Sequence, residues 1–455
     1  MSIANWEIAE ERYGKAIWPS DAEYDPARTV YAGDVDRRPA VILRPTSAAQ
    51  VAQVVRLARQ TGLELAVRSG GHSSAGHGVC DGGIVLDLGT MQAMEIDVEG
   101  RTVWTETGIP VRNFVEAVAE HGLATGFGDG SLVGVGGITL GGGIGYLARK
   151  HGMTIDDLLA AEIVTADGEL LFVDEHNHPD LFWAIRGGGG NFGVATRFKF
   201  RLHELDGVYG GMLVLPVTPE ILEAFIAEAD AAPEELTTIV NVWTAPPLPF
   251  VPAKYHGKPI ILAMMCFAGP VEVGENVVDR FRAIATPLAD MVRAMPYSEM
   301  FPPGDPLAHP VSAARTMFID QVDRATAETI LERISASNAD VAMAQLRVLG
   351  GAMARVSTDA TAFAHRQSKI MAYLSAVYSD PHEADEHAAW AEDFSAAIRQ
   401  SDPGAYVNFV GDAGQELLRQ AVYPGATGER LAKIKAKYDP TNLFRSNHNI
   451  RPSQT

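Results

Sequence analysis

The sequence predicts an α+β protein of two or three domains, and three observations support this class. First, the chain has 455 residues, which is too many for one small domain. Second, helix and strand patterns alternate over the first 205 residues. Third, from about residue 206, proline-rich pieces separate apolar strands from alanine-rich helices. The composition, with 47% hydrophobic and 21% charged residues, is typical of a soluble globular protein with a sizeable core.

Local signals place the elements along the chain. Residues 45–47 open a helix whose valines share one face, and Gly62 ends it. The pair Asp167-Gly168 predicts a hairpin between two apolar runs. Strands are predicted at 63–67, 83–88, 102–107, 163–165, 170–173, 194–202 and 260–267, and further helices at 110–122, 179–186, 388–399 and 429–438.

Charge and cysteine content exclude several classes of protein. There are 37 Lys and Arg against 57 Asp and Glu, so the net charge is 37 − 57 = −20, which argues against nucleic acid or an anionic membrane as partner. The longest apolar run, 260–268, is about half of a membrane span. Residues 1–7 show no secretory signal, so we expect a cytoplasmic protein. Two cysteines exclude a disulfide framework and a cysteine-based metal cluster.

The 44 glycines are unevenly distributed, and many of them lie in three segments, 68–83, 126–145 and 187–193. In the first cluster, Arg68-Ser69-Gly70-Gly71-His72-Ser73-Ser74-Ala75-Gly76, consecutive glycines let backbone N–H groups converge on an anion. The serine hydroxyls and Arg68 complete the chemistry of a pyrophosphate cradle. The G-x-G-x-x-G spacing of a dinucleotide fingerprint is missing, and a plain surface loop is the alternative interpretation.

The other two clusters carry apolar residues instead of the serines of a flexible linker. Seven glycines lie among small and β-branched residues in 134–146, which favours backbone packed against a flat ring system. The third cluster, 187–193, lies between a predicted helix and a predicted strand. Three clusters in this order predict one large ligand lying along the backbone.

These motifs resemble the FAD-linked oxidases of the vanillyl-alcohol oxidase superfamily, and within it the berberine-bridge-enzyme-like group and the bacterial nicotine oxidases. The resemblance covers nearly the whole chain. It rests on Arg44-Pro45-Thr46, Arg68–His72, Gly134–Gly145, Gly189–Gly193, Tyr438-Asp439-Pro440-Thr441-Asn442-Leu443-Phe444 and Asn447–Ile450.

The resemblance implies FAD as cofactor and a two-part, PCMH-type FAD-binding domain. Residues 1–205 would form its first part and 401–455 its second part, and 206–400 would form a substrate domain with an antiparallel sheet covered by helices. His72 would bond covalently to the flavin. The cofactor-binding candidates are His72, Arg68, Ser69, Gly70, Gly71, Ser73, Gly76, Val133, Gly136, Gly137, Thr139, Gly142, Gly143, Gly145, Val194, Asn447 and Asn449.

Two positions of the family pattern concern the flavin. Many members form a second link through a cysteine where this chain has Gly130, so the resemblance implies a single link here. Val133 occupies the family's gate position, where a small or valine side chain goes with oxygen access and an oxidase.

The family's catalytic base does not carry over. A glutamate is expected on the strand after His365-Arg366, where this chain has Ala372 or Tyr373, and Phe409 replaces a tyrosine. Gln345 and Arg347 share one face of a predicted strand. We therefore take Tyr373, Arg347, Gln345 and Tyr406 as catalytic candidates, with Arg347 lowering a tyrosine pKa. The alternative is that Arg347 is a solvated strand residue.

The implied activity is hydride abstraction from a C–H next to oxygen or nitrogen of a small molecule, with O2 as acceptor and H2O2 as product. Two alternatives remain open at this point: a dehydrogenase of the same fold, and a non-redox flavoprotein. The sequence leaves the substrate open among sugar, alkaloid, polyketide and phenol, and it leaves the oligomeric state open. No metal site is expected.

Overall fold

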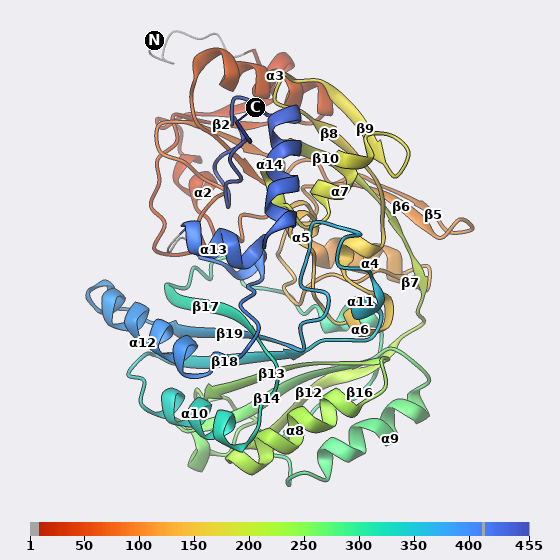
Figure 1. The fold of residues 1–455 in the computed structure, drawn as a ribbon, viewed down its shortest axis with the longest axis vertical. Coiled ribbons are helices and arrows are strands. Elements are labelled where there is room, and N and C mark those ends of the chain that lie inside the picture. The colour runs from red at the N-terminus through yellow and green to blue at the C-terminus, as the bar shows by residue number, and fades with distance from the viewer. Residues whose placement is uncertain (1–8, 412–414, 455) are drawn as a thin grey trace.

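The computed structural model describes residues 9–411 and 415–454, so the residues 1–7 used above lie outside it. One four-stranded and one five-stranded sheet form the upper part of the molecule, and an eight-stranded sheet forms the lower part (Figure 1). The α+β class and an antiparallel sheet covered by helices are confirmed. In the described part of the chain, no helix is long and apolar enough to cross a membrane.

The four-stranded sheet carries the first glycine loop at the end of one strand. Its order is β1 (Lys15–Ile17), β2 (Val41–Arg44), β4 (Ile84–Asp87), β3 (Leu65–Arg68). The predicted first helix is α3 (Ala48–Thr61): the Ser47 hydroxyl accepts from Gln50 N at 3.3 Å, and Gly62 ends the helix with a left-handed φ of 71°. The short helices α1 (Glu10–Tyr13) and α2 (Tyr24–Arg28) precede it.

The five-stranded antiparallel sheet has the order β5 (Met94–Asp97), β6 (Thr102–Glu106), β10 (Val194–Arg201), β8 (Leu158–Val164), β9 (Leu170–Asp174). The Asp167-Gly168 hairpin joins β8 and β9 as predicted. Alternate residues of β10, such as Phe198 and Phe200, are buried against α4 (Val111–Ala119) and α7 (Pro179–Ile185). The remaining short elements here are β7 (Leu123–Ala124), β11 (His203–Glu204), α5 (Val135–Gly141) and α6 (Ala148–His151).

The eight-stranded sheet separates a helix layer from the rest of the molecule. Its strands are β12 (Val208–Pro216), β13 (Leu236–Thr244), β14 (Pro259–Phe267), β15 (Ala289–Asp290), β16 (Arg293–Met295), β17 (Ser312–Ile319), β18 (Val341–Val348) and β19 (Ile370–Val377). Residues such as Leu346 and Ala372 pack with α8 (Pro219–Ala231), α9 (Val271–Arg282), α10 (Arg324–Ser335) and α12 (Ala384–Ala397). The short helix α11 (Ala352–Arg355) follows β18. Because side chains alternate along a strand, Gln345, Arg347 and Tyr373 belong to the opposite face.

The last segment returns to the upper part, where α14 (Ala426–Tyr438) packs beside α7 (Figure 1). α13 (Gln415–Val422) precedes it. Lys435 of α14 is fully buried, and its ammonium group donates to Asp439 Oδ2 at 2.6 Å, to Asn191 O at 2.7 Å and to Phe444 O at 2.8 Å. This lysine therefore ties the third glycine loop to the C-terminal tail.

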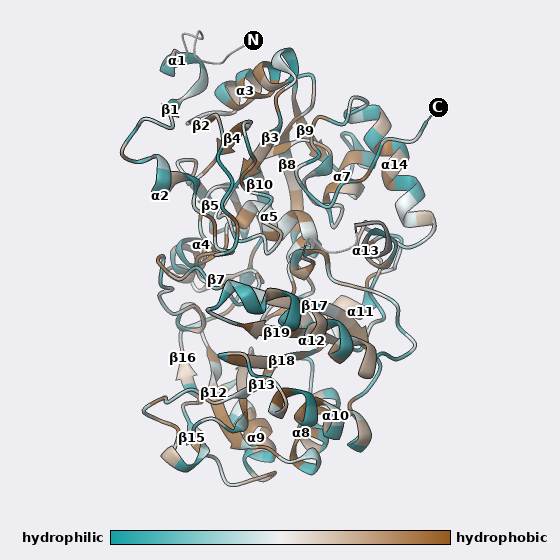
Figure 2. Cartoon of the chain, turned by 90° about the vertical axis from the view of Figure 1, so that its left-hand side faces the viewer, coloured by the Kyte–Doolittle hydropathy of each residue, from teal (hydrophilic) through white to brown (hydrophobic). Residues whose placement is uncertain are grey.

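Hydropathy follows these layers, since hydrophobic colour concentrates on the strands and hydrophilic colour on the outward sides of α3 and α12 (Figure 2). Several boundaries differ from prediction; β8, for example, begins at Leu158, where a strand over 163–165 was predicted. The second glycine cluster contains the helix α5, and α12 and α14 begin before the predicted residues 388 and 429. In α12, the carboxylates of Asp385 and Glu386 lie in the first turn, where they interact favourably with the positive end of the helix dipole. This interaction favours the earlier start of α12.

Candidate active site

A cavity of about 670 Å³ lies between the glycine loops and the open face of the eight-stranded sheet. All three glycine clusters contribute to its wall, and so do the four catalytic candidates Tyr373, Arg347, Gln345 and Tyr406. The structure thus brings together the two groups of residues that the sequence analysis selected separately.

The first glycine loop presents a run of free backbone donors. None of the N–H groups of residues 70–75 donates to an acceptor elsewhere in the described part of the chain. The guanidinium group of Arg68 is instead bound to Asp87 at 2.8 Å, and the Ser69 hydroxyl donates to Thr107 O at 2.6 Å. Arg68 is therefore already paired, although it lines the cavity, and its part in the cradle stays a prediction. Backbone N–H groups are what the loop itself offers an anion.

Glycine is required where the first two loops touch. A Cβ on Gly134 would lie 2.2 Å from Gly70 N and 2.1 Å from Ser69 Oγ. At Gly137 and Gly190, by contrast, a Cβ would meet nothing within 4 Å. Both of these glycines line the cavity, so they leave room along its wall for a flat ligand.

His72 lies in the cavity wall with one ring nitrogen engaged. Its Nδ1 is 2.8 Å from Gly70 O, and because a carbonyl oxygen only accepts, Nδ1 carries the proton and Nε2 keeps its lone pair. Burial lowers the pKa of His72 below the ordinary value of 6.5, although the Gly70 hydrogen bond opposes this. The ring is thus a neutral nucleophile near neutral pH.

The other cofactor candidates divide into two groups. Those lining the cavity are Arg68, Ser69, Gly70, Gly71, Ser73, Val133, Gly136, Gly137, Val194 and Asn447. Those packed behind its wall are Gly76, Thr139, Gly142, Gly143, Gly145 and Asn449. A Cβ on Gly76 would lie 2.7 Å from Val35, and one on Gly145 would lie 1.3 Å from Phe127 O, so these glycines allow close packing of the loops.

Arg347 is the centre of a buried polar network on the open sheet face. Its guanidinium group donates to Asp129 Oδ1 at 2.8 Å, to Ile144 O at 2.8 Å and to Gln345 Oε1 at 2.8 and 3.0 Å. It also lies 5.1 Å from the centroid of the Phe409 ring. With 3% of its side chain exposed, Arg347 is not the solvated strand residue of the alternative interpretation.

The two tyrosines are neutral phenols at ordinary pH. Burial raises the pKa of Tyr373, and Arg347 is not among the groups that shift it. Burial also raises the pKa of Tyr406, opposed by hydrogen bonds from Asn408 and from Gly143 N, each at 2.9 Å. The expected lowering of a tyrosine pKa by Arg347 is therefore wrong for Tyr373, and at Tyr406 the stronger effect of burial outweighs it.

Among the residues of the cavity wall that sequence reasoning missed are Tyr31, Asp129 and Tyr423. Asp129 is the carboxylate bound to Arg347, and its second oxygen accepts no hydrogen bond within the described residues. Its place beside Gly130, the position of the family's second flavin link, was the available signal. Tyr31 comes from an irregular segment without a motif, and Tyr423 follows α13 with no local pattern.

Gly130 does not have a left-handed φ, but a Cβ there would lie 2.6 Å from Val133 Cγ2. Packing against Val133, and not backbone conformation, is thus the obstacle to a side chain at this position.

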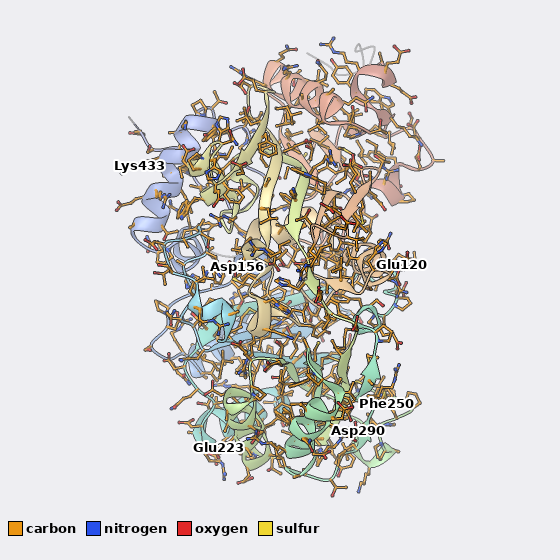
Figure 3. All side chains as sticks on the ribbon, turned by 90° about the vertical axis from the view of Figure 1, so that its right-hand side faces the viewer. Glu120, Asp156, Glu223, Phe250, Asp290 and Lys433 are labelled. Atoms are coloured by element: carbon orange, nitrogen blue, oxygen red, sulfur yellow. The ribbon has the colours of Figure 1, made fainter. Side chains whose placement is uncertain are left out.

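An ion pair holds the two sides of the cavity together. Arg366, fully buried, donates to both oxygens of Asp156 at 2.8 Å and to the Thr361 hydroxyl. Asp156 lies at the level where the upper and lower parts meet (Figure 3). The pair joins the loop before β19 to the segment before β8, and so fixes the sheet face against the glycine loops.

The cavity fits FAD by the chemistry of its wall. Free N–H groups of residues 70–75 suit the pyrophosphate, and the open glycines suit a flat ring. The Tyr423 hydroxyl and Asn447 Oδ1 are buried without a partner in the described part of the chain, and both residues line the cavity. Such atoms cost free energy unless a ligand pairs with them.

Comparisons with known proteins agree with this site. The FAD binding domain family matches residues 39–174, and the berberine and berberine-like family matches 405–451. The chain is 29% identical over 452 residues to (R)-6-hydroxynicotine oxidase of Paenarthrobacter nicotinovorans, covering 96% of this chain and 97% of that one. It is 30% identical over 462 residues to an uncharacterized FAD-linked oxidoreductase of Bacillus subtilis, and the match covers 97% of this chain and 98% of that protein.

A solved structure extends the agreement to the fold. The crystal structure of 6-hydroxy-D-nicotine oxidase from Arthrobacter nicotinovorans matches with a TM-score of 0.88 and 27% identity, covering 98% of this chain and all of that chain. Glycine loops, cavity, family matches and full-length relatives lead to one conclusion: the chain belongs to the FAD-linked oxidoreductases with a berberine-like C-terminal segment, and it is an FAD-dependent oxidoreductase.

Proposed function

We propose that this protein is an oxidase that removes a hydride from a C–H next to oxygen or nitrogen of a small organic molecule, with O2 as electron acceptor and H2O2 as product. One observation carries the proposal: the glycine loops and the polar sheet face line the same cavity. Membership of the oxidoreductases sets aside the non-redox alternative.

FAD, when bound, supplies the hydride acceptor and returns the electrons to O2. We propose that the first and last segments of the chain hold it, through the N–H groups of 70–75, the Tyr423 hydroxyl and Asn447. His72 would form a single covalent link through Nε2, because Nδ1 is engaged with Gly70 O. Gly130 offers no thiol for a second link.

The open sheet face would bind the substrate and accept its proton. Arg347 is paired and hydrogen-bonded on three sides, so its role is to hold Asp129 and Gln345 in place. The free oxygen of Asp129 is the proposed acceptor of the substrate OH or NH proton. Tyr373 and Tyr406, kept neutral by burial, would orient the substrate by hydrogen bonding.

Val133 supports the choice of oxygen as acceptor. It lines the cavity with a branched but short side chain, and its carbonyl accepts from Val111 N at 2.8 Å, which fixes its backbone. A dehydrogenase remains the second candidate. The two candidates differ in the rate at which O2 reoxidises the reduced protein.

The test is a two-step reaction. The yellow protein is reduced anaerobically with amines, sugars and phenols in turn, and the reduced protein is then mixed with air-saturated buffer. An oxidase returns to the oxidised spectrum quickly and yields one H2O2 per substrate oxidised. Reduction by a substrate followed by slow reoxidation, with rapid transfer to a quinone dye instead, would contradict the choice of O2.

A further inference from the structure

Tyr31 covers the imidazole of His72. The two ring centroids are 4.8 Å apart and the ring planes differ by 18°, so the rings are stacked. Both residues line the cavity. Tyr31 is 42% exposed and belongs to none of the hydrophobic core clusters, so its ring contact with His72 is not a by-product of core packing.

The segment that carries Tyr31, residues 30–33, is hydrogen-bonded on two sides. Tyr31 N donates to Gly71 O at 3.0 Å, which ties it to the glycine loop of His72. On the other side, Gly33 N donates to Pro310 O at 3.0 Å and His309 Nδ1 to Val30 O at 2.9 Å. A Cβ on Gly33 would lie 2.1 Å from His309 O, so the segment has no room to move toward that loop. These backbone contacts thus fix the position of Tyr31 beside His72.

His72 is therefore held by two independent contacts. The Gly70 carbonyl holds Nδ1, and the Tyr31 ring lies on the face of the imidazole. Together they oppose rotation of the ring about its Cβ–Cγ bond, because a half-turn would put Cδ2 in place of Nδ1 at the Gly70 carbonyl and Cε1 in place of Nε2. Stacked aromatic pairs are stabilised beyond the burial of their area, so the Tyr31 ring favours this plane of the imidazole.

We propose that Tyr31 is a positioning residue for the attachment of FAD to His72: its ring holds the imidazole plane so that Nε2 faces the cavity. This rests on the covalent link proposed above. In the attachment, Nε2 forms a C–N bond to the 8α-methyl carbon and one C–H bond of that methyl breaks. The electron pair of the broken bond passes through the flavin to O2, which leaves as H2O2 with the methyl proton and the imidazole Nδ1 proton.

The experiment measures covalent attachment and not turnover. Apoprotein from riboflavin-limited cells is mixed with excess FAD in air, and the fraction of chain carrying the added mass is followed by intact mass spectrometry. Tyr31→Leu should attach FAD about threefold to tenfold more slowly than wild type, and Tyr31→Phe, which keeps the ring, within about twofold of it. Tyr255→Leu, a half-buried tyrosine outside the cavity, is the matched control and should attach FAD at the wild-type rate.

Several outcomes would overturn the proposal. Wild-type kinetics in Tyr31→Leu would show that the stack is not needed, and a Tyr31→Phe variant as slow as Tyr31→Leu would assign the effect to the hydroxyl. Quenching of FAD fluorescence reports binding before attachment. A Tyr31→Leu rate that recovers at saturating FAD would assign Tyr31 to binding alone.

Two controls separate this proposal from the link itself. His72→Ala should bind FAD without gaining its mass. A wild-type chain that never gains the mass would overturn the link and with it the role of Tyr31, whereas normal attachment in every Tyr31 variant would leave the link standing and remove only the role of Tyr31. The flavin peptide should carry the flavin on Nε2, and attachment on Nδ1 would contradict the proposed orientation.

Discussion

Lys435→Met should strongly destabilise the protein, because it breaks a buried ion pair from one side. Lys435 and Asp439 are both fully buried, and the ammonium group also serves two backbone carbonyls, Asn191 O and Phe444 O. Removing one partner of a buried pair costs about 3–5 kcal/mol, since the other charge stays buried without compensation. Hydrogen bonds to Asp439 from Leu443 N and Phe444 N, at 2.8 and 2.9 Å, relieve part of this cost and favour the lower end.

The same helix offers a matched control two residues away. Lys437 pairs with Asp180 at 2.7 Å, but its side chain is 59% exposed. An exposed pair is worth only about 0–1 kcal/mol, so Lys437→Met should change stability by less than about 1 kcal/mol. The substitution, the helix and the charge change are identical, and only burial differs.

Urea unfolding of the two FAD-loaded variants, followed by circular dichroism, measures the difference. Lys435→Met should also release any FAD not covalently held, because both the third glycine loop and the tail lose an anchor. Adding Asp439→Asn to Lys435→Met should recover part of the lost stability by removing the unpaired charge. Equal unfolding free energies for Lys435→Met and Lys437→Met would refute the reasoning.

Four further outcomes are expected. Val133→Leu should slow reoxidation by O2 at least about tenfold while leaving anaerobic reduction unchanged in stopped-flow experiments; equal reoxidation would refute the gate. Asp129→Asn should slow anaerobic reduction at least about tenfold, or about 1.4 kcal/mol; an unchanged rate of reduction would exclude Asp129 as proton acceptor. Burial lowers the pKa of His72, so as pH falls the unfolded chain binds a proton there before the folded apoprotein does. FAD attachment should therefore decline at a lower pH than the ordinary histidine titration at 6.5, and a decline that coincides with that titration would contradict this. Gly130→Cys should give no second flavin link, because its side chain would meet Val133 Cγ2; a doubly linked flavin peptide would show that the loop adjusts.

Local signals predicted the parts of the fold that depend on local chemistry. The Ser47 cap, the Gly62 stop and the Asp167-Gly168 hairpin each act within a few residues, so the sequence alone determines them. The glycine loops were equally visible, because close approach of backbone requires the absence of a side chain wherever the partner comes from.

The residues that were misjudged or missed depend on partners far along the chain. Arg68 meets Asp87 because β3 and β4 are parallel neighbours, and Arg347 meets Asp129 across 218 positions. The direction of the Tyr373 pKa depends on burial, which only the packed sheet decides. Pattern and spacing place residues on a face, but they do not say whether a charge on that face is already paired.

The return of the C-terminal segment has a consequence for biosynthesis. Asn447 and Phe444 line the cavity, and the lysine that fixes them lies on α14, so the wall of the site includes residues made more than 350 positions after the first glycine loop. Folding during synthesis proceeds from the N-terminus. The nascent chain can therefore complete its two upper sheets while the cavity is still open on one side. We therefore expect the completed cavity, and with it stable retention of FAD, only after translation has passed residue 447.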